Sequence, residues 1–467
     1  MSLGTHLESE FRRLNLGARA GGADAAAAGA EPPWRRGRLK PTFSSPHLPP
    51  PLPPGISRAS ASIRTKKVCT SSAATDCVAA QIPRSDVITG RDDCNVTDAI
   101  HSRMGRGLHR RPGHPLSLIR AAIYEHFDAR SGSEGSSFAK FDDLWPVVSA
   151  KANFDSVLVP ADHVSRGYND TYYVDADTVL RCHTSAHQAE LLTAGERRFL
   201  VTGDVYRRDS IDATHYPAFH QMEGVRVFDQ SEWGGEGADG TAFCQEELRK
   251  ELEGLAKHLF GDVEMRWVDA YFPFTEPSME LEIFYQDEWL EVLGCGVMQP
   301  AILEAAGVDP ATNKAWAFGL GLERLAMVLF GIPDIRLFWS DDERFTKQFS
   351  KGAGDKDAWR SLRFSSFSKY PPVFKDVAFW LPPSAEDGAE STFTENNLCE
   401  VVRAEGGDLI EEVKLIDEFV NKKTGRTSNC FRVTYRSMER SLTDDEINGI
   451  QTRVRERMEA ELGVELR

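Results

Sequence analysis

Two stretches of this sequence carry more charge and more glycine than a packed core needs, and they constrain the fold most. The first, residues 203–224, reads GDVYRRDSIDATHYPAFHQMEG, and the second, residues 319–324, reads GLGLER. Arg207 stands where a β-rich segment should end in a loop, and Arg324 opens an apolar segment that reads as a helix. The two arginines, with the His, Phe, Gln and Glu residues of the first stretch, predict one site for a polyphosphate and a small ligand that carries both charges.

The length and composition allow two folded domains and a tail. The chain has 467 residues, of which 41% are hydrophobic and 10% aromatic, so it can bury substantial cores. Its formal net charge of −16 argues against coating nucleic acid by bulk electrostatics, so any such contact must use a local basic surface. Its eight cysteines contain no Cys-x-x-Cys pair, which argues against a zinc site and a disulfide framework and favours a reducing compartment.

The N-terminal residues 1–84 are predicted to be a transit peptide or a disordered segment. Residues 32–75 contain eight Lys or Arg and no Asp or Glu, together with a proline cluster and many serines. An ordinary disordered, proline-rich tail is the alternative that remains open. No run of 18 apolar residues occurs, so we expect no membrane span.

Residues 85–336 are predicted to form an α+β domain built on an antiparallel sheet. A helix begins near Pro115, and the glycine- and serine-rich residues 131–137 are expected to end it. Between residues 157 and 227, short β-rich segments alternate with turns, as in an antiparallel sheet. The further predicted elements are a helix at 241–260, strands at 279–285 and 289–293, and an apolar helix over the sheet at 321–329.

Residues 337–363 read as a linker, and residues 364–467 have a complete βαββαβ pattern, the ferredoxin-like split unit. Thr443 and Glu446 form a capping box for its second helix, whose apolar residues keep one face. The predicted order is strand 374–381, helix 394–404, strand 410–420, strand 429–436, helix 443–462 and a last strand at Val464. The chain therefore reads as an α+β protein with two folded domains.

Paired arginines suit a polyphosphate, because their planar guanidinium groups hold phosphate oxygens and keep their charge. A helix that begins near Arg324 would add the positive field of its N-terminus. Gly319 and Gly321 would let the backbone approach the ligand closely. Each arginine by itself is more simply interpreted as a solvated surface residue. Only the combination of the two with their flanking residues favours a polyphosphate site.

Several motifs occur in order and give the chain a resemblance to class II aminoacyl-tRNA synthetases, and within them to the single-chain organellar phenylalanyl-tRNA synthetases. Residues 206–223 resemble motif 2 and residues 319–324 resemble motif 3, while motif 1 is placed only loosely between the helix at 115 and Pro146. The residues similar to phenylalanine-specific signatures are Asn153, Phe154, Asp155, Pro160, His163, Arg166, Asp170, Thr171, Tyr172, residues 183–188 and residues 272–274. The resemblance covers residues 113–467 and implies ATP-dependent attachment of L-phenylalanine to tRNA(Phe).

The resemblance also implies a site that works by positioning and charge, with no protein nucleophile. Arg207 would hold the α-phosphate and the amino-acid carboxylate, and Arg324 the γ-phosphate, so these two are the candidate catalytic residues. Phe219 would stack on adenine, and His215 would support the phosphates. Glu291 would contact ATP or its Mg²⁺, the implied cofactor, and we expect no zinc and no organic cofactor.

The amino-acid ligand needs acceptors for its ammonium group and an apolar pocket for its ring. Gln221 and Glu223 provide an amide oxygen and a negative charge on one face of a strand. Phe272 and Phe274 also share a face and could hold a phenyl ring, although such a pair is more often part of a core. The remaining candidate substrate-binding residues are His183, Ser185, Ala186, His187, Gln188, Thr214, Met222, Glu291, Ala317 and Phe318. Structural roles remain open for the histidines, and for His220 the structural role is preferred.

By the same resemblance, the C-terminal unit is an anticodon-binding domain. The candidate tRNA-binding residues are Lys422, Lys423, Arg426, Arg432 and Arg436, with Phe431 and Tyr435 available for base stacking. A solvated hairpin is the alternative interpretation of that charge. Because both parts lie on one polypeptide, we expect a monomer. The predicted transit peptide places it in the mitochondrial matrix, the chloroplast stroma or both. Its expected partners are ATP, L-phenylalanine and tRNA(Phe), and we expect no membrane partner.

Two other functions remain open at this point. One is a synthetase-derived RNA-binding or regulatory protein with an inactive site, against which the presence of Arg207, Gln221, Glu223, Glu291 and Arg324 argues. The other is a class II-like ligase that makes a free amide or a lipoyl or biotinyl adduct, against which the βαββαβ unit argues. With no span left for an editing domain, some activation of tyrosine is expected, because an apolar pocket rejects an added hydroxyl only about a hundredfold.

Overall fold

The computed structural model describes residues 82–134, 137–235, 237–353, 357–366, 370–382, 393–437 and 439–467. These residues belong to one compact unit, Ala79–Arg467. The predicted transit peptide, residues 1–84, therefore lies almost wholly outside the described residues. Within the described ranges, no helix is long and apolar enough to cross a membrane.

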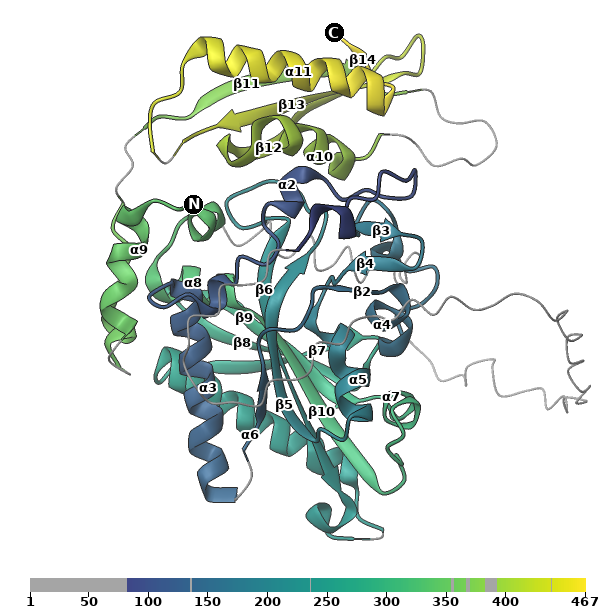
Figure 1. Cartoon of the computed structure of the whole chain (residues 1–467), viewed down its shortest axis with the longest axis vertical. Coiled ribbons are helices and arrows are strands. Elements are labelled where there is room, and N and C mark those ends of the chain that lie inside the picture. The colour runs from purple at the N-terminus through teal and green to yellow at the C-terminus, as the bar shows by residue number, and fades with distance from the viewer. Residues whose placement is uncertain are drawn as a thin grey trace, which may run out of the picture. The chain divides into compact units, whose positions relative to one another are not determined.

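A seven-stranded sheet forms the centre of the larger domain (Figure 1). Its strand order is β1-β5-β6-β10-β9-β8-β7, and every neighbouring pair is antiparallel except β1 and β5. In that order the strands span Ala139–Phe141, Arg198–Tyr206, Ala218–Asp229, Asn313–Gly321, Glu288–Met298, Thr275–Tyr285 and Met265–Phe272. The predicted α+β class with an antiparallel sheet is confirmed.

Helices α3 (Pro115–Glu134), α6 (Gly240–Phe260) and α8 (Leu322–Phe330) cover one face of this sheet (Figure 1). They bury apolar residues that recur at helical spacing, and Phe127 of α3 stacks on Phe318 of β10 with ring centroids 5.6 Å apart. Helix α3 continues through Glu134, so the predicted break at residues 131–137 begins too early. A glycine inside a helix costs only about 1 kcal/mol relative to alanine, which does not end a helix whose earlier turns are packed.

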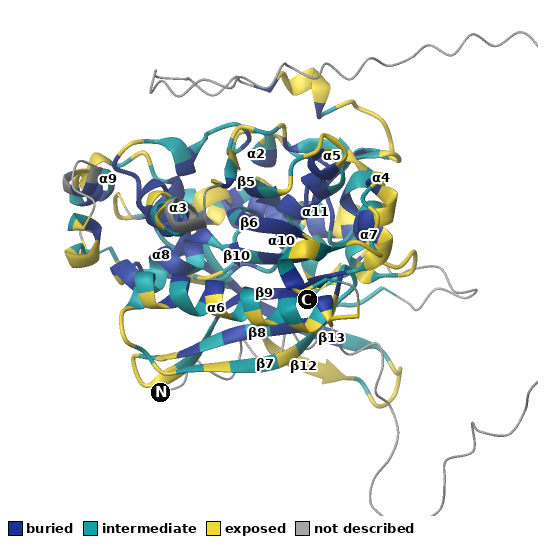
Figure 2. Cartoon of the chain, turned by 90° about the horizontal axis from the view of Figure 1, so that it is seen from below, coloured by how far each residue is buried: buried dark blue, intermediate teal, exposed yellow. Residues whose placement is uncertain are grey.

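A thinner layer lies on the opposite face of the sheet. Helices α5 (Gln188–Thr193) and α7 (Pro300–Ala305) pack their leucine and isoleucine side chains there, against residues that include Phe199 and Val225. A three-stranded sheet, with order β2-β4-β3, contributes Val147–Ser149, Thr178–Leu180 and Tyr173–Asp175, and the short helices α2 and α4 span Asp98–His101 and Ala150–Asn153. Figure 2 shows that β5, β6, β9 and β10 contain the longest buried runs, as expected for strands covered on both faces.

Residues 337–363 do not form a linker, and this prediction is wrong. Six apolar residues of this segment are at most 4% exposed and belong to the same core as α3 and α8; they are Leu337, Phe338, Trp339, Phe345, Phe349 and Trp359. Helix α9 (Glu343–Phe349) carries two of them. Their spacing follows neither a helical nor a strand period over most of the segment, so the sequence pattern did not reveal that they are buried.

The C-terminal unit is the predicted βαββαβ fold. Its four strands lie in the order β12-β13-β11-β14, and helices α10 (Glu395–Gly406) and α11 (Asp444–Leu462) supply the buried residues of its core. The strands span Ile410–Val420, Thr427–Tyr435, Val373–Trp380 and Glu465–Leu466 in that order. Thr443 caps α11 by accepting a hydrogen bond from the backbone N–H of Glu446, which is one half of the predicted capping box. The Glu446 side chain accepts instead from Arg440, at 2.8 Å.

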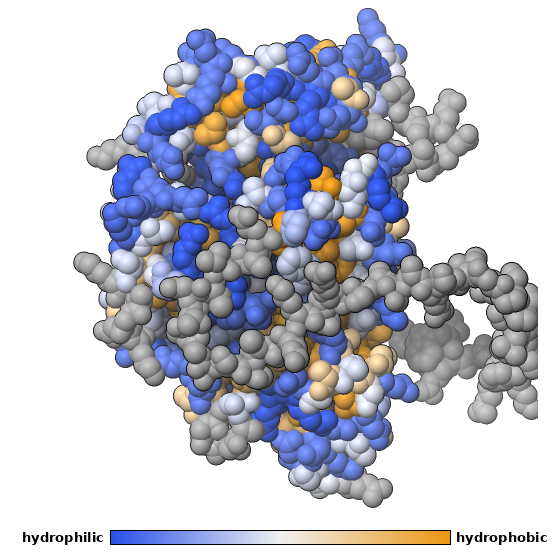
Figure 3. Space-filling model, viewed as in Figure 1, coloured by the Kyte–Doolittle hydropathy of each residue, from blue (hydrophilic) through white to orange (hydrophobic). Residues whose placement is uncertain are grey.

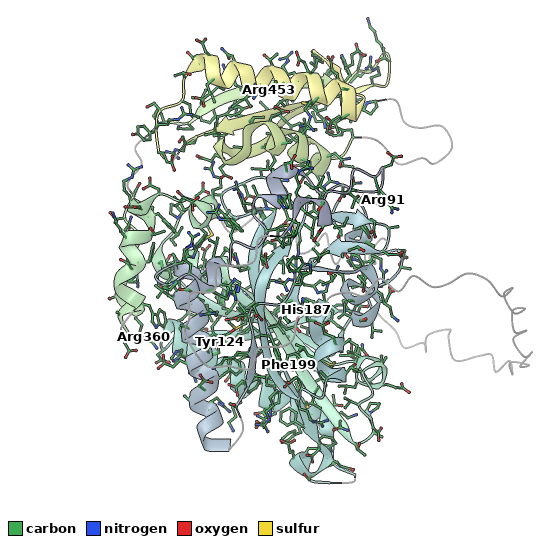
Figure 4. The ribbon with its side chains drawn as sticks, viewed as in Figure 1. Arg91, Tyr124, His187, Phe199, Arg360 and Arg453 are labelled. Carbon is green, nitrogen blue, oxygen red and sulfur yellow. The ribbon has the colours of Figure 1, made fainter. Side chains whose placement is uncertain are left out.

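Hydrophilic residues cover most of the coloured surface in Figure 3, and apolar residues form small, separate groups on it. In Figure 4, the labelled Arg91, Arg360 and Arg453 lie at the periphery, whereas Phe199 and His187 lie close to the central sheet. Most large apolar side chains of the described residues are instead buried inside the larger domain and the C-terminal unit.

Candidate functional site

Strand β6 presents two different faces, and only one of them carries the candidate site. Phe219, Gln221 and Glu223 share one face, while His220 and Met222 point to the side covered by α3, α6 and α8. Met222 is completely buried in that core, so its predicted contact with a substrate is wrong. The strand alternation explains the difference, because neighbouring residues of a strand cannot both face one ligand.

Glu223 is a buried carboxyl group with two side-chain donors. Its side chain accepts hydrogen bonds from the Ser185 hydroxyl and from the Gln188 amide, the latter at 2.6 Å. Glu223 is only 3% exposed, and burial raises its pKa to about 7 although both hydrogen bonds favour the charged form. Three predicted substrate-binding residues from two separate parts of the chain therefore meet at one buried charge.

Arg207 continues the ladder beyond the end of β5. Its backbone N–H donates to the Pro217 carbonyl at 3.0 Å, and its Nε donates to the Cys182 carbonyl at 2.8 Å. The guanidinium carbon lies 5.2 Å from the centroid of the Phe219 ring. The predicted phosphate-binding arginine and the predicted adenine-stacking ring are therefore neighbours, held by backbone contacts of Arg207.

Arg324 lies in the first turn of α8 and faces an acidic group on β8 and β9. Its guanidinium reaches the Glu291 carboxylate at 3.4 Å, and Glu280 and Glu282 lie on the same part of the sheet. Burial, followed by the charges of Glu291 and Glu282, raises the pKa of Glu280 to about 7. Glu280 and Glu282 were not among the predicted site residues. Their spacing of two on a predicted strand indicates that they share a face.

The register of β6 brings the two arginines to one end of the sheet. Gln221 pairs with Gly203 of β5 on one side and with Gly321 of β10 on the other. Arg207 follows β5 at this end, and Arg324 follows β10 at the same end. Arg207 and Arg324 therefore follow the two strands that flank β6, at the same end of the sheet.

The apolar part of the site lies over glycines. The Phe272 and Phe274 rings stack at 5.7 Å, and a Cβ atom at Gly294 would come within 2.7 Å of the Phe272 ring. A Cβ atom at Gly319 would meet no atom within 4 Å, so open space lies above this part of the sheet. Ala317 belongs to the face that Val225 shares.

Phe318 does not line this space, and the prediction that it does is wrong. It is 2% exposed on the helix-covered face, where it packs against Phe127 and against the position of Gly224. Strand alternation again separates it from its neighbour Ala317. A Cβ atom at Gly224 would lie 2.2 Å from the Phe318 ring, which explains why glycine stands opposite this phenylalanine.

The two candidate histidines of residues 183–188 differ in their surroundings. Both ring nitrogens of His187 have partners, Arg181 at 2.9 Å and Glu190 at 2.7 Å, so the structural alternative is favoured for this residue. His183 is half-buried, burial of its ring lowers its pKa to about 3, and its Nδ1 has no hydrogen-bond partner among the described residues. Ala186, at 3% exposure, separates them in the same turn.

Thr214 and His215 lie in the loop between β5 and β6, and both contact Asp212. Asp212 accepts from the Thr214 hydroxyl at 2.8 Å and lies 2.6 Å from Nδ1 of His215. The same loop is tied to the C-terminal unit, because the Ile211 carbonyl accepts from the Val413 N–H at 2.9 Å. The ligand-binding roles of Thr214 and His215 stay predictions.

The candidate tRNA-binding residues of the C-terminal unit fall into two groups. Lys422 and Lys423 are exposed in the turn between β12 and β13. The three arginines are ion-paired: Arg426 with Glu465, Arg432 with Asp376, and Arg436 with Glu411. Among these five candidates, only the two lysines of the turn have no acidic partner within the described part of the chain.

Phe431 and Tyr435 are not available for base stacking, and this prediction is wrong. They are at most 2% exposed in the core under α10 and α11, because their positions on β13 face the helices. The open face of the same sheet carries other aromatic residues that the sequence analysis missed: Phe374, Trp380 and Phe419. Trp380 and Phe419 lie 6.2 Å apart, and the guanidinium groups of Arg426 and Arg467 lie 5.2 and 5.1 Å from the Trp380 ring.

Comparison with known proteins adds two domain families. Residues 136–349 match the family described as tRNA synthetases class II core domain (F), and residues 368–467 match the ferredoxin-fold anticodon binding domain. The fold and the site thus define a class II tRNA synthetase core joined to an anticodon-binding domain.

Relatives narrow the assignment within this class. The chloroplastic/mitochondrial phenylalanine--tRNA ligase of Arabidopsis thaliana is 60% identical over 387 residues, which are 83% of this chain and 86% of the relative. The mitochondrial phenylalanine--tRNA ligases of Mus musculus and Dictyostelium discoideum are 48% and 46% identical, over 80% of this chain and 86% and 89% of the relatives. The chain belongs to the family of phenylalanine--tRNA ligases of mitochondria and chloroplasts.

The buried Glu223 predicts a pH-dependent gain in stability for Glu223→Gln. Above pH 7 the wild-type carboxylate is ionised at a cost in desolvation, whereas at pH 5 it is protonated in the fold. A pKa raised from 4.5 to about 7 makes the gain larger at pH 8 than at pH 5 by about 2–3 kcal/mol. Denaturant unfolding of both proteins at the two pH values measures this difference.

Glu304→Gln is the matched control, because Glu304 is exposed on α7. It should change stability equally at both pH values. An equal effect of Glu223→Gln at pH 5 and pH 8 would mean that the carboxyl group is not held neutral by burial.

Proposed function

We propose that this protein attaches L-phenylalanine to tRNA(Phe) through a phenylalanyl-adenylate formed from ATP. One observation carries the proposal: a single face of β6 joins a buried carboxyl group, an open apolar space and two flanking arginines. A ligand that fits this face needs an ammonium group, an apolar ring and a neighbouring polyphosphate. Phenylalanine together with ATP has that chemistry.

Phenylalanine is recognised at both of its ends. Its ammonium group is held by Glu223 and Gln221, and the hydrogen bonds from Ser185 and Gln188 fix the carboxylate in place. Its ring lies over Gly319, where the glycine leaves open space, beside the stacked rings of Phe272 and Phe274. A tyrosine hydroxyl would enter the same apolar space, so tyrosine is activated weakly.

ATP lies along the end of the sheet where the two arginines flank β6. Adenine stacks on Phe219, Arg207 holds the α-phosphate and the amino-acid carboxylate, and Arg324 holds the γ-phosphate. His215 supports the phosphates from the loop. The chain supplies orientation and positive charge for the in-line attack of the carboxylate on the α-phosphate, and no side chain forms a covalent bond.

The acidic group beside Arg324 suits a magnesium ion. Glu291 and its neighbours Glu280 and Glu282 repel one another, and this repulsion contributes to the raised pKa of Glu280. Magnesium is usually held by one or two carboxylates together with phosphate oxygens, so a single glutamate beside the phosphates is enough to bind it. Glu291 would hold the ion, and the ion would neutralise charge on the phosphates.

The tRNA is read by the C-terminal unit. Lys422 and Lys423 attract its backbone, and Arg426, Arg432 and Arg436 add charge to the same sheet. Phe419 provides an exposed ring and Trp380 a half-buried ring on the open face, on which unpaired bases of the anticodon loop stack. This local surface lets a protein with a net charge of −16 bind nucleic acid.

The protein acts in mitochondria, in chloroplasts or in both, as its relatives do by name. Residues 1–84 serve as the transit peptide. Both the catalytic core and the anticodon-binding domain lie on this chain, so it works as a monomer. Its partners are ATP, L-phenylalanine and tRNA(Phe).

Two alternative functions find less support. An RNA-binding protein with an inactive site would not need the buried Glu223 cluster, which costs desolvation energy. A class II-like ligase for free amides or cofactor adducts would not need the domain at residues 368–467.

ATP–pyrophosphate exchange across the twenty amino acids separates these possibilities. Phenylalanine should drive exchange, and tyrosine should do so about a hundredfold less efficiently. Arg207→Ala should lower phenylalanine-dependent exchange by about 10²–10³-fold, since it removes a preorganised positive charge. Arg91→Ala, at an exposed ion pair with Asp93, is the control and should leave exchange unchanged. The proposed function would be contradicted if none of the twenty amino acids drove exchange. It would also be contradicted if an amino acid other than phenylalanine were the best substrate.

Trp380→Ala tests the stacking surface on its own. Loss of stacking on one base is worth about 1–3 kcal/mol, so KM for tRNA should rise between about fivefold and a hundredfold. Phenylalanine-dependent exchange, which needs no tRNA, should stay at the wild-type level. Phe284→Ala removes an exposed ring from β8 of the catalytic core and serves as the control. An unchanged KM for tRNA in Trp380→Ala would mean that the tRNA does not stack on the open face of this sheet.

A further inference from the structure

Glu323, the residue before Arg324, is buried at the junction of α8 and β6. It is 2% exposed, and its two carboxylate oxygens contact the same residue, His220. One oxygen accepts from the His220 backbone N–H at 2.8 Å, and the other lies 2.7 Å from Nδ1 of the His220 ring. A carboxylate that contacts both backbone and side chain of one residue fixes its position and its rotation.

The surroundings leave His220 little freedom to move. Its ring stacks on Trp339 at 5.7 Å and lies 5.1 Å from the ring of His109, and the residue is completely buried. Trp339 comes from the segment that the sequence analysis assigned to a linker. The bond between Glu323 and His220 is therefore enclosed by rings from two other parts of the chain.

Each partner of this bond is the chain neighbour of a residue at the nucleotide site. His220 follows Phe219 on β6, and Glu323 precedes Arg324 on α8. A shift of α8 along β6 would move Arg324 relative to Phe219 by the same amount. Displacements of about 1 Å at such a site lower rates about a hundredfold, so a device that prevents this shift has a direct effect on catalysis.

We propose that Glu323 is a positioning residue that sets the distance between the adenine-stacking ring and the triphosphate-binding arginine. It touches neither ATP nor phenylalanine, and it acts through Phe219 and Arg324. The proposal rests on the proposed function, because it assumes that one nucleotide lies between these two side chains. Its effect falls on ATP, since the ammonium acceptor Glu223 is held independently by Ser185 and Gln188.

Glu323→Gln tests the proposal with little change in volume. Glutamine offers one acceptor oxygen where glutamate offers two, so one of the two His220 donors loses its partner. The KM for ATP in phenylalanine-dependent pyrophosphate exchange should rise about tenfold to a hundredfold. The KM for phenylalanine should change less than about threefold, which a general loss of folding would not produce.

Glu251→Gln provides the matched control. Glu251 is a second buried glutamate, 3% exposed, that lies 2.9 Å from Nε2 of His126 and 2.8 Å from Nε of Arg130 between α3 and α6. The substitution damages a pair of the same kind away from β6, so it should reduce thermal stability and leave the KM for ATP within about twofold of wild type. His220→Gln keeps the backbone bond to Glu323 and loses the ring, so its KM for ATP should rise by about threefold to tenfold.

The outcomes separate this proposal from the proposed function. A rise in the KM for ATP that is specific to Glu323→Gln and His220→Gln supports the proposal. Equal effects of Glu323→Gln and Glu251→Gln, or equal increases in the KM values for ATP and phenylalanine, overturn it while the function stands. If Glu323→Gln does not fold, an unchanged KM for ATP in His220→Gln overturns it. Absence of phenylalanine-dependent exchange in the wild-type protein would overturn the function itself.

Discussion

The pairing of β6 with β5 on one side and β10 on the other is the constraint on which the site depends. Gln221 is opposite Gly203 and Gly321, and this register carries Arg207 and Arg324 to the same end of the sheet. A slip of one residue would turn Gln221 and Glu223 into the helix-covered core and bring His220 and Met222 to the open face. The contacts of Glu323 with His220 hold this register from the buried side.

Charge is kept inside the fold where the ligands would bring the opposite charge. Burial raises the pKa of Glu223, and burial together with the neighbouring Glu291 and Glu282 carboxylates raises the pKa of Glu280. An ammonium group and a metal–phosphate group would reverse these penalties on binding.

The sequence predicted the elements with strong periods and the residues with distinctive chemistry. The helices at 240–260 and 444–462, the βαββαβ unit and the pairing of Gln221 with Glu223 on one face follow from local patterns. Met222 and Phe318 were misplaced because contiguous motif residues were assigned to one face, although strand alternation separates them. The contact between Glu323 and His220, the burial of Trp339 and the open position of Trp380 depend on which face the helices cover, and no local pattern contains that information.

A crystal structure with phenylalanine and a non-hydrolysable ATP analogue tests the central claim most directly. We expect adenine on the Phe219 ring, the triphosphate between Arg207 and Arg324, the ammonium group at Glu223 and the phenyl ring above Gly319 beside Phe272. Both ligands bound on this face of β6, with their groups at these positions, would support the proposed site. A nucleotide that contacts only one of the two arginines, or a phenyl ring that lies away from Phe272 and Gly319, would contradict it.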